Sequence, residues 1–238
     1  SGSAYIVYGG DFGDSNFIAA NGGATLNGQG ADGERFTGND GNDILIGNGG
    51  DDRFFGGLGD DEITSLAGND VVFGGDGSDV ISVGDGQDRV WAGEGDDHIT
   101  AGAGVKYLFG GLGSDTFIVA SDDGVRILDD EGDDNVTVTG TGINTIETGK
   151  GDDVISSLDG TNTVLGGSGN NNITTGNGVD TITTLDGDNT LTIGLGNDVV
   201  VTGDGNNTIS SNGGHNTITT GSGVATIVTG SGNDNIAV

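Results

Sequence analysis

The sequence predicts an all-β protein, a parallel β-roll (β-solenoid) with 18 residues per coil, built from two nine-residue units. Three observations carry this prediction. Glycine returns every nine residues through most of the chain, a large apolar residue follows each of these glycines four positions later, and Asp or Asn stands between the two.

The repeating unit reads Gly-x-Gly-x-Asp-x-U-x-x, where U is a large apolar residue. Two one-residue slips interrupt the frame around residues 116–141. The third-position glycines are Gly41, Gly50, Gly59, Gly68, Gly77, Gly86, Gly95, Gly104, Gly113 and Gly132, and then Gly142 and every ninth residue to Gly232. The chain contains 53 glycines, no proline and no cysteine, and their strict period separates it from a flexible linker.

Each unit is expected to form a glycine turn followed by a short strand. Glycine at the third position permits backbone torsions that other residues resist. In the strand, the seventh residue points inward and its neighbours point outward. One file of Ile, Val and Leu per face would then form the core, and no coil could bury that file without its neighbours.

The fifth positions predict metal binding. Residues 18 apart stack in successive coils, so turns bring pairs such as Asp61 and Asp79 together. Paired carboxylates repel unless a cation joins them, and an oxygen-only shell suits Ca²⁺. Lys106 stands where an Asp is expected and could replace an ion there. The predicted calcium ligands are Asp43, Asp52, Asp61, Asp70, Asp79, Asp88, Asp97, Asp115, Asp180 and Asp198.

Four segments are expected: irregular coils over 1–37, an Asp-type calcium-binding roll over 38–118, an acidic slip or linker coil over 119–139, and an Asn/Thr-type solenoid over 140–238. Most fifth positions after 140 are Asn, which can hydrogen-bond its copy in the next coil. The last segment is therefore expected to need little calcium, with Asp180 and Asp198 as its one carboxylate pair.

The net charge of −31 argues against nucleic acid and anionic membranes as partners, because both require clustered Lys and Arg. No apolar run reaches membrane-spanning length. His98 and His215 lie far apart in the repeat, and the many carboxylates follow metal geometry rather than that of an acid/base pair. The sequence predicts no catalytic site, so we expect a protein that is not an enzyme.

Outward eighth positions form a candidate interface, because Phe55, Phe73, Trp91 and Phe109 recur every 18 residues. One interpretation is a self-stacked ladder that stiffens the sheet. Another is a docking surface, since contiguous exposed apolar area commonly has a partner; carbohydrate stacking is a third. Later outward positions favour Thr and Ser, as in Thr190 and Thr192, which is typical of a solvent-facing strand and also resembles ice-binding solenoids.

The segment Gly56-Gly57-Leu58-Gly59-Asp60-Asp61-Glu62-Ile63 and its later copies resemble the repeats-in-toxin (RTX) family. The resemblance is specific over 38–118 and looser over 140–238. It implies type I secretion and calcium-driven folding outside the cell. The expected role is a secreted structural protein of a matrix fibre, surface layer or adhesin, self-assembling end to end or joined to neighbouring domains. A calcium-folded module of a secreted enzyme is the alternative, and an ice-binding solenoid a minor one.

Overall fold

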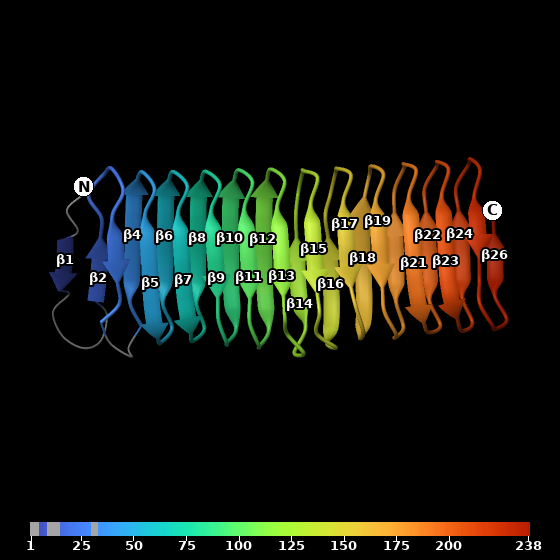
Figure 1. Ribbon diagram of the computed structural model, residues 1–238, viewed down its shortest axis with the longest axis horizontal. Helices are drawn as coiled ribbons and strands as arrows, with labels where there is room; N and C mark the ends of the chain where they lie inside the picture. The colour runs from blue at the N-terminus through green and yellow to red at the C-terminus, as the bar shows by residue number, and fades with distance from the viewer. Residues whose placement is uncertain (1–4, 9–14, 30–32) are drawn as a thin grey trace. The chain divides into compact units, whose positions relative to one another are not determined.

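The computed structural model describes residues 5–8, 15–29 and 33–238 and divides into two compact units, a first unit of Ser1–Ile118 and a second unit of Val119–Val238. Each unit is a parallel β-solenoid, as predicted, in which successive strands alternate between two sheets (Figure 1). The described residues form strands and turns without a helix, so no helix among them could cross a membrane. The predicted divisions at residues 37 and 139 stay predictions.

In the first unit, β1 (Tyr5–Tyr8) pairs antiparallel with β2, and the later pairings are parallel. Parts of the predicted irregular segment 1–37 lie outside the described residues. One sheet contains β2 (Ser15–Ile18), β4 (Arg35–Asp40), β6 (Arg53–Leu58), β8 (Val71–Asp76), β10 (Asp88–Glu94) and β12 (Lys106–Leu112). The other contains β3 (Thr25–Asn27), β5 (Ile44–Gly49), β7 (Glu62–Ala67), β9 (Val80–Val83) and β11 (His98–Ala101). Strand β13 (Thr116–Val119) includes the unit boundary.

The second unit repeats this plan. One sheet contains β14 (Val125–Leu128), β16 (Ile143–Glu147), β18 (Thr161–Gly167), β20 (Thr181–Thr184), β22 (Val199–Thr202), β24 (Thr217–Thr220) and β26 (Asn235–Ala237). The other contains β15 (Asn135–Val138), β17 (Val154–Ser157), β19 (Asn172–Thr175), β21 (Thr190–Leu195), β23 (Thr208–Gly213) and β25 (Thr226–Val228).

Strand register confirms the predicted coil length. Val90 pairs with Leu108 in the first unit and Ile155 with Ile173 in the second, both 18 residues apart. A spacing of 19 residues occurs at Ile127–Ile146, inside the region where the sequence shows frame slips. One extra residue is accommodated there in the turns, because a slip within a strand would send its apolar set to the outer face.

Third-position glycines are required by both torsion and space. Gly77 has φ of +124°, which L side chains rarely adopt. A Cβ on Gly77 would also lie 2.4 Å from the carbonyl oxygen of Gly59 in the preceding coil. The close stacking of the turns therefore explains why glycine recurs every nine residues.

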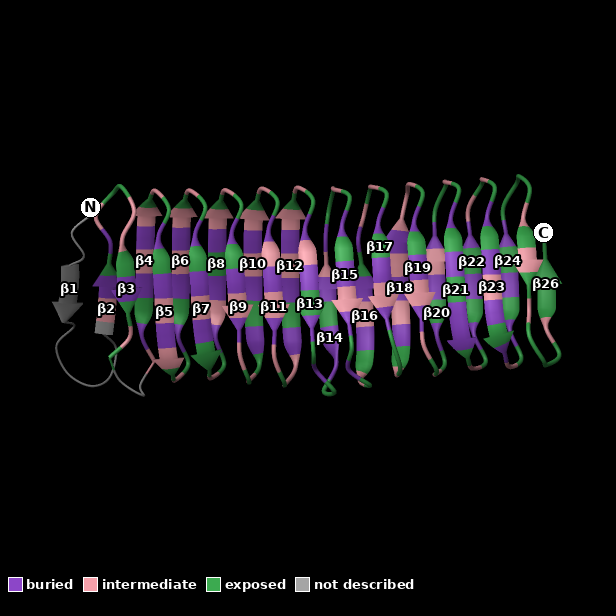
Figure 2. Ribbon diagram, in the orientation of Figure 1, coloured by how far each residue is buried: buried purple, intermediate pink, exposed green. Residues whose placement is uncertain are grey.

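On each face, three positions of the repeating unit point inward, whereas the prediction was one apolar file per face. Strands show alternating burial (Figure 2), and the seventh position is fully buried, as at Phe54. The fifth position before it and the ninth position after it also point inward, as Asp52 and Gly56 show. The ninth position is Gly, Ala, Val, Ser or Thr at most coils, and such small residues do not stand out as core in the sequence.

Candidate metal sites in the turns

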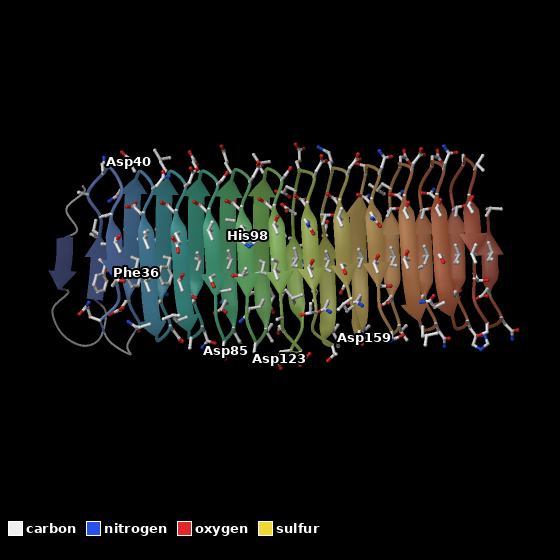
Figure 3. All side chains as sticks on the ribbon, viewed as in Figure 1. Phe36, Asp40, Asp85, His98, Asp123 and Asp159 are labelled. Atoms are coloured by element: carbon white, nitrogen blue, oxygen red, sulfur yellow. The ribbon has the colours of Figure 1, made fainter. Side chains whose placement is uncertain are left out.

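All ten predicted calcium ligands lie in the interior of the turns. Each has an exposed fraction between 0 % and 2 %. Surface carboxylates such as Asp85 and Asp159, by contrast, lie in the outer turns and are exposed (Figure 3). A carboxylate buried in every coil requires a compensating partner, because desolvating an ionised group is costly.

One oxygen of each first-unit carboxylate has a backbone partner. Asp61 Oδ1 accepts the N–H of Asp43 at 2.7 Å, and Asp79 Oδ1 accepts the N–H of Asp61 at 2.8 Å. The other edge follows the same rule, with the Asp52 N–H donating to Asp70 Oδ1 at 2.8 Å. The stacked Asp residues thus tie each coil to the next, at the 18-residue spacing that the sequence predicts.

The second oxygen is the unusual one. In seven of the ten predicted ligands the Oδ2 atom is buried and accepts no hydrogen bond of standard length and angle from any residue that the structure describes. These carboxylates are Asp43, Asp61, Asp70, Asp79, Asp97, Asp180 and Asp198. Asp70 and Asp180 still have a neighbouring hydroxyl, that of Ser65 and of Thr175, which lowers the carboxyl pKa. Native structures contain few such buried oxygens, and a bound ion or water commonly accounts for them. Five of the seven belong to the first unit.

Burial shifts the acidity of the first-unit carboxyls. Desolvation raises the pKa of Asp61 and of Asp97 to about 7, and repulsion from the Asp residues stacked above and below adds to it. Desolvation likewise raises the pKa of Asp70 and of Asp79 to about 6. Without a cation, this interior therefore penalises the ionised form of these carboxyls.

Ninth-position glycines leave space beside the open oxygens of Asp43, Asp61 and Asp79, whereas Ser65 and Ala92 hold this position before Asp70 and Asp97. A Cβ on Gly56 would lie 2.3 Å from Asp61 Oδ2 and 2.4 Å from the carbonyl oxygen of Gly74. Gly74 repeats the arrangement one coil later, where a Cβ would lie 2.2 Å from Asp79 Oδ2. Carboxylate and carbonyl oxygens converging on an open space form the donor set that Ca²⁺ prefers.

Lys106 shows what a cation does in this position. Its Nζ donates to Asp88 Oδ2 at 2.6 Å and to the carbonyl oxygens of Gly84, Gly86 and Ala103 at 2.8, 2.7 and 2.6 Å. Both side chains of the ion pair are fully buried. One carboxylate and three turn carbonyls thus converge on a positive charge at a fifth position.

After residue 140, in the second unit, six of the eleven fifth positions carry an Asn amide in place of the carboxylate. Asn144 Nδ2 donates to Asn162 Oδ1 at 2.9 Å, and Asn189 Nδ2 donates to Asn207 Oδ1 at 3.0 Å. The predicted Asn ladder is therefore present, although Asn171 Nδ2 turns to the carbonyl oxygen of Gly166 at 2.7 Å instead. An amide carries donors as well as an acceptor, so it joins stacked turns without a metal.

Interior hydroxyls complete this metal-independent arrangement. Ser157 Oγ donates to Asn162 Oδ1 at 2.6 Å, and Thr148 Oγ1 donates to Asp153 Oδ2 at 2.6 Å. Asp153 thus has both oxygens satisfied, one by the N–H of Asp134 and the other by the hydroxyl of Thr148. Sequence reasoning missed these hydroxyls because Ser and Thr at ninth positions look like ordinary strand residues.

Four further buried carboxylates, Glu34, Asp129, Asp134 and Asp153, are absent from the predicted ligands. Glu34 stands one coil before Asp52, where its N–H donates to Asp52 Oδ1 at 2.7 Å. Its own carboxylate accepts the amide of Asn48 at 2.6 Å, so it has a partner already. Asp134 donates its N–H to Asp153 Oδ1 at 3.0 Å across a 19-residue coil. Gly132 stands two residues before Asp134, and this third-position glycine could have identified Asp134 as a fifth position.

The outward aromatic residues form a self-stacked ladder. Ring centroids are 5.2 Å apart for Phe55–Phe73, 4.9 Å for Phe73–Trp91 and 5.2 Å for Trp91–Phe109, with interplanar angles of 0° to 11°. Phe73 is exposed, and the other three rings are half-buried. The stiffening interpretation is thereby supported, and a docking role is compatible with it. A second ladder, Phe17–Phe36–Phe54, stacks inside the core.

These features define a class of protein: a parallel β-solenoid whose turns present buried oxygens to hard divalent cations. The family model of the RTX calcium-binding nonapeptide repeat matches residues 29–63, 55–90, 82–117, 138–173, 156–191, 165–200 and 192–227. The chain belongs to this family of calcium-binding repeats. No curated protein and no solved structure matches it.

Proposed function

We propose that this chain is a secreted calcium-binding structural protein, a segment of a matrix fibre, surface layer or adhesin, whose first unit folds when calcium fills its turns. The observation that carries the proposal is the row of buried Oδ2 atoms in Asp43, Asp61, Asp79 and Asp97 on one edge of that unit. Each is an anionic acceptor without a described donor. Ca²⁺ would supply the missing charge and join successive coils.

Calcium would act as the folding switch of such a chain. Without the ion, stacked carboxylates such as Asp61 and Asp79 repel one another inside a desolvated turn. Ion binding that occurs only in the folded state adds directly to stability, by about 2.7 kcal/mol per site at an ion concentration one hundred times Kd. Several sites along one unit would therefore separate an unfolded state at low calcium from a rigid one at high calcium.

A structural rather than catalytic role is proposed because the same carboxylate, apolar and small inward files recur from coil to coil. The interior of each unit therefore repeats similar chemistry from coil to coil, whereas a catalytic site requires one place that differs from the rest. Family membership supports secretion through a type I system. His98 lies half-buried on β11, on the outer face of its sheet (Figure 3), as expected for a surface residue.

The proposal is tested by titrating the chelated full chain with Ca²⁺ while recording far-ultraviolet circular dichroism and small-angle scattering. We expect a cooperative gain of β structure and a fall in radius of gyration, centred on the first unit, with Mg²⁺ as the control ion. Mg²⁺ should be far less effective, because it prefers octahedral, partly hydrated sites. A chain that is fully folded in chelator and unchanged by calcium would contradict the proposal.

A further inference from the structure

One outer face of the first unit combines aromatic residues with most of the chain's exposed positive charge. Two parallel rows follow strands β4, β6, β8, β10 and β12 in register. The sixth-position row is Arg35, Arg53, Val71, Arg89 and Tyr107, and the eighth-position row is Thr37, Phe55, Phe73, Trp91 and Phe109. We call this surface the arginine–aromatic face.

The aromatic row presents ring edges to solvent. Because neighbouring rings lie nearly parallel at 4.9 to 5.2 Å, each inner ring has both faces covered by its neighbours. A sugar or a nucleobase therefore cannot stack on Phe73 or Trp91. The ring edge carries the positive end of the aromatic quadrupole, so this row favours oxygen-rich, anionic groups.

The arginine row adds full positive charges. The chain has only six Lys and Arg residues, and Arg35, Arg53 and Arg89 are exposed on this one face. Arg35 and Arg53 are direct cross-strand partners, an arrangement of like charges that costs stability. Among the residues that the structure describes, none of the three forms a salt bridge with a carboxylate.

The guanidinium groups also lie close to the aromatic rings. Arg35 lies over the ring of Phe55, 4.6 Å from its centroid, and Arg89 lies 5.7 Å from the centroid of Tyr107. Stacking of this kind orients the planar guanidinium while leaving its N–H donors available to a ligand. The opposite sheet has no comparable row, since Ile44, Glu62, Val80 and His98 hold its sixth positions.

We propose that the arginine–aromatic face binds a linear, carboxylate-bearing polysaccharide that lies along the stacking direction. The three arginines stand in one row, with Cα positions about 4.8 and 9.6 Å apart by strand spacing, and the guanidiniums of Arg35 and Arg89 both lie over a ring of the next strand. A polymer whose carboxylates recur along its length can occupy such a row, and each guanidinium pairs with a planar carboxylate through two parallel hydrogen bonds. Several weak contacts on one chain then add in affinity.

Acidic residues at the strand ends set the limits of this surface. Asp40, Asp76 and Glu94 are exposed where β4, β8 and β10 end, so a polyanion is repelled from these ends and confined to the middle of the strands. The overall charge of −31 acts over distance but is screened beyond about 8 Å at physiological ionic strength. Contact therefore depends on the local guanidiniums.

The test uses the calcium-loaded full chain and a polygalacturonate oligomer too short to gel, at fixed calcium. Trp91 is the only tryptophan and stands in the ladder, so its fluorescence reports binding directly. We expect binding by the wild type and at least about a tenfold loss in R35Q/R53Q/R89Q, which is about 1.4 kcal/mol or more. The control variant K150Q removes an exposed charge from the second unit and should bind like the wild type.

Three outcomes would overturn the proposal. Equal binding by the triple variant would assign the contact to calcium bridges at the acidic turns. Equal binding of the methyl-esterified oligomer would show that carboxylates are not recognised. A sedimentation-detected dimer of the wild type that the triple variant lacks, without oligomer binding by either, would make a second copy of the chain the occupant instead.

Discussion

Lys106 offers the sharpest perturbation, because it is a fixed cation in a place where other coils hold a carboxylate. Its Nζ donates to Asp88 Oδ2 at 2.6 Å and to three carbonyl oxygens, all inside the turn. In K106M these four acceptors lose their donor. Removing one partner of a buried ion pair costs about 3–5 kcal/mol, so we expect that loss in the free energy of unfolding.

K106D should behave differently from K106M, because Asp restores the fifth-position pattern and creates a calcium site between residues 88 and 106. At calcium one hundred times the Kd of the new site, the gain is about 2.7 kcal/mol. The expected order of stability at saturating calcium is therefore wild type, then K106D, then K106M. As calcium falls to that Kd, the gain of K106D over its own ion-free state should shrink to about 0.4 kcal/mol, and without calcium K106D should be the less stable variant because two buried carboxylates then face each other.

Urea denaturation followed by circular dichroism measures the free energies, and metal analysis after dialysis counts the ions. K106D should bind one more calcium ion than the wild type, and K106M should bind the same number as the wild type. The reasoning is refuted if K106D gains no ion, or if it is no more stable than K106M at saturating calcium.

Three further predictions concern the ion-free chain and the second unit. In chelator, hydrogen exchange should be faster in the first unit than in the second, and parallel loss of protection in both would count against the role of the Asn residues. Asp61 and Asp97 have folded-state pKa values of about 7 against an ordinary 3.8, so the folded state binds more protons than the unfolded state between these values. The free energy of unfolding of the ion-free chain should therefore be highest below about pH 4 and fall as the pH rises to about 7. Urea midpoints that rise over this range would contradict the burial argument. N189D removes the amide that donates to Asn207 and leaves an unpaired carboxylate oxygen; it should cost about 1–3 kcal/mol in chelator and recover in calcium, whereas equal loss in both would exclude a new ion site.

The repeat was predictable because its period appears directly in the sequence. Residues 18 apart must stack once the nine-residue unit is recognised, and this was enough to predict that Asp61 and Asp79 meet. The same reasoning predicted the Asn144–Asn162 hydrogen bond and placed Lys106 directly after Asp88 in the stack. All three depend only on equivalent positions stacking in successive coils.

The missed features depend on three-dimensional detail within a coil. The sequence does not show that one carboxylate oxygen accepts a backbone N–H while the other stays open, because both oxygens are chemically alike. Ser157 and Thr148 act on interior acceptors five residues later, a contact that follows from the turn path rather than from the period. Asp134 was missed because it follows a frame slip, where counting from the preceding repeat fails.

The most direct test of calcium binding by the first unit is anomalous diffraction from crystals of the full chain grown with calcium. The account predicts ions beside Oδ2 of Asp61, Asp70, Asp79 and the other open carboxylates of that unit, with one further site at Asp180 and Asp198. Turns joined by Asn amides should hold none. Equal ion occupancy in the turns of both units, or ions bound only at exposed acids, would contradict the account.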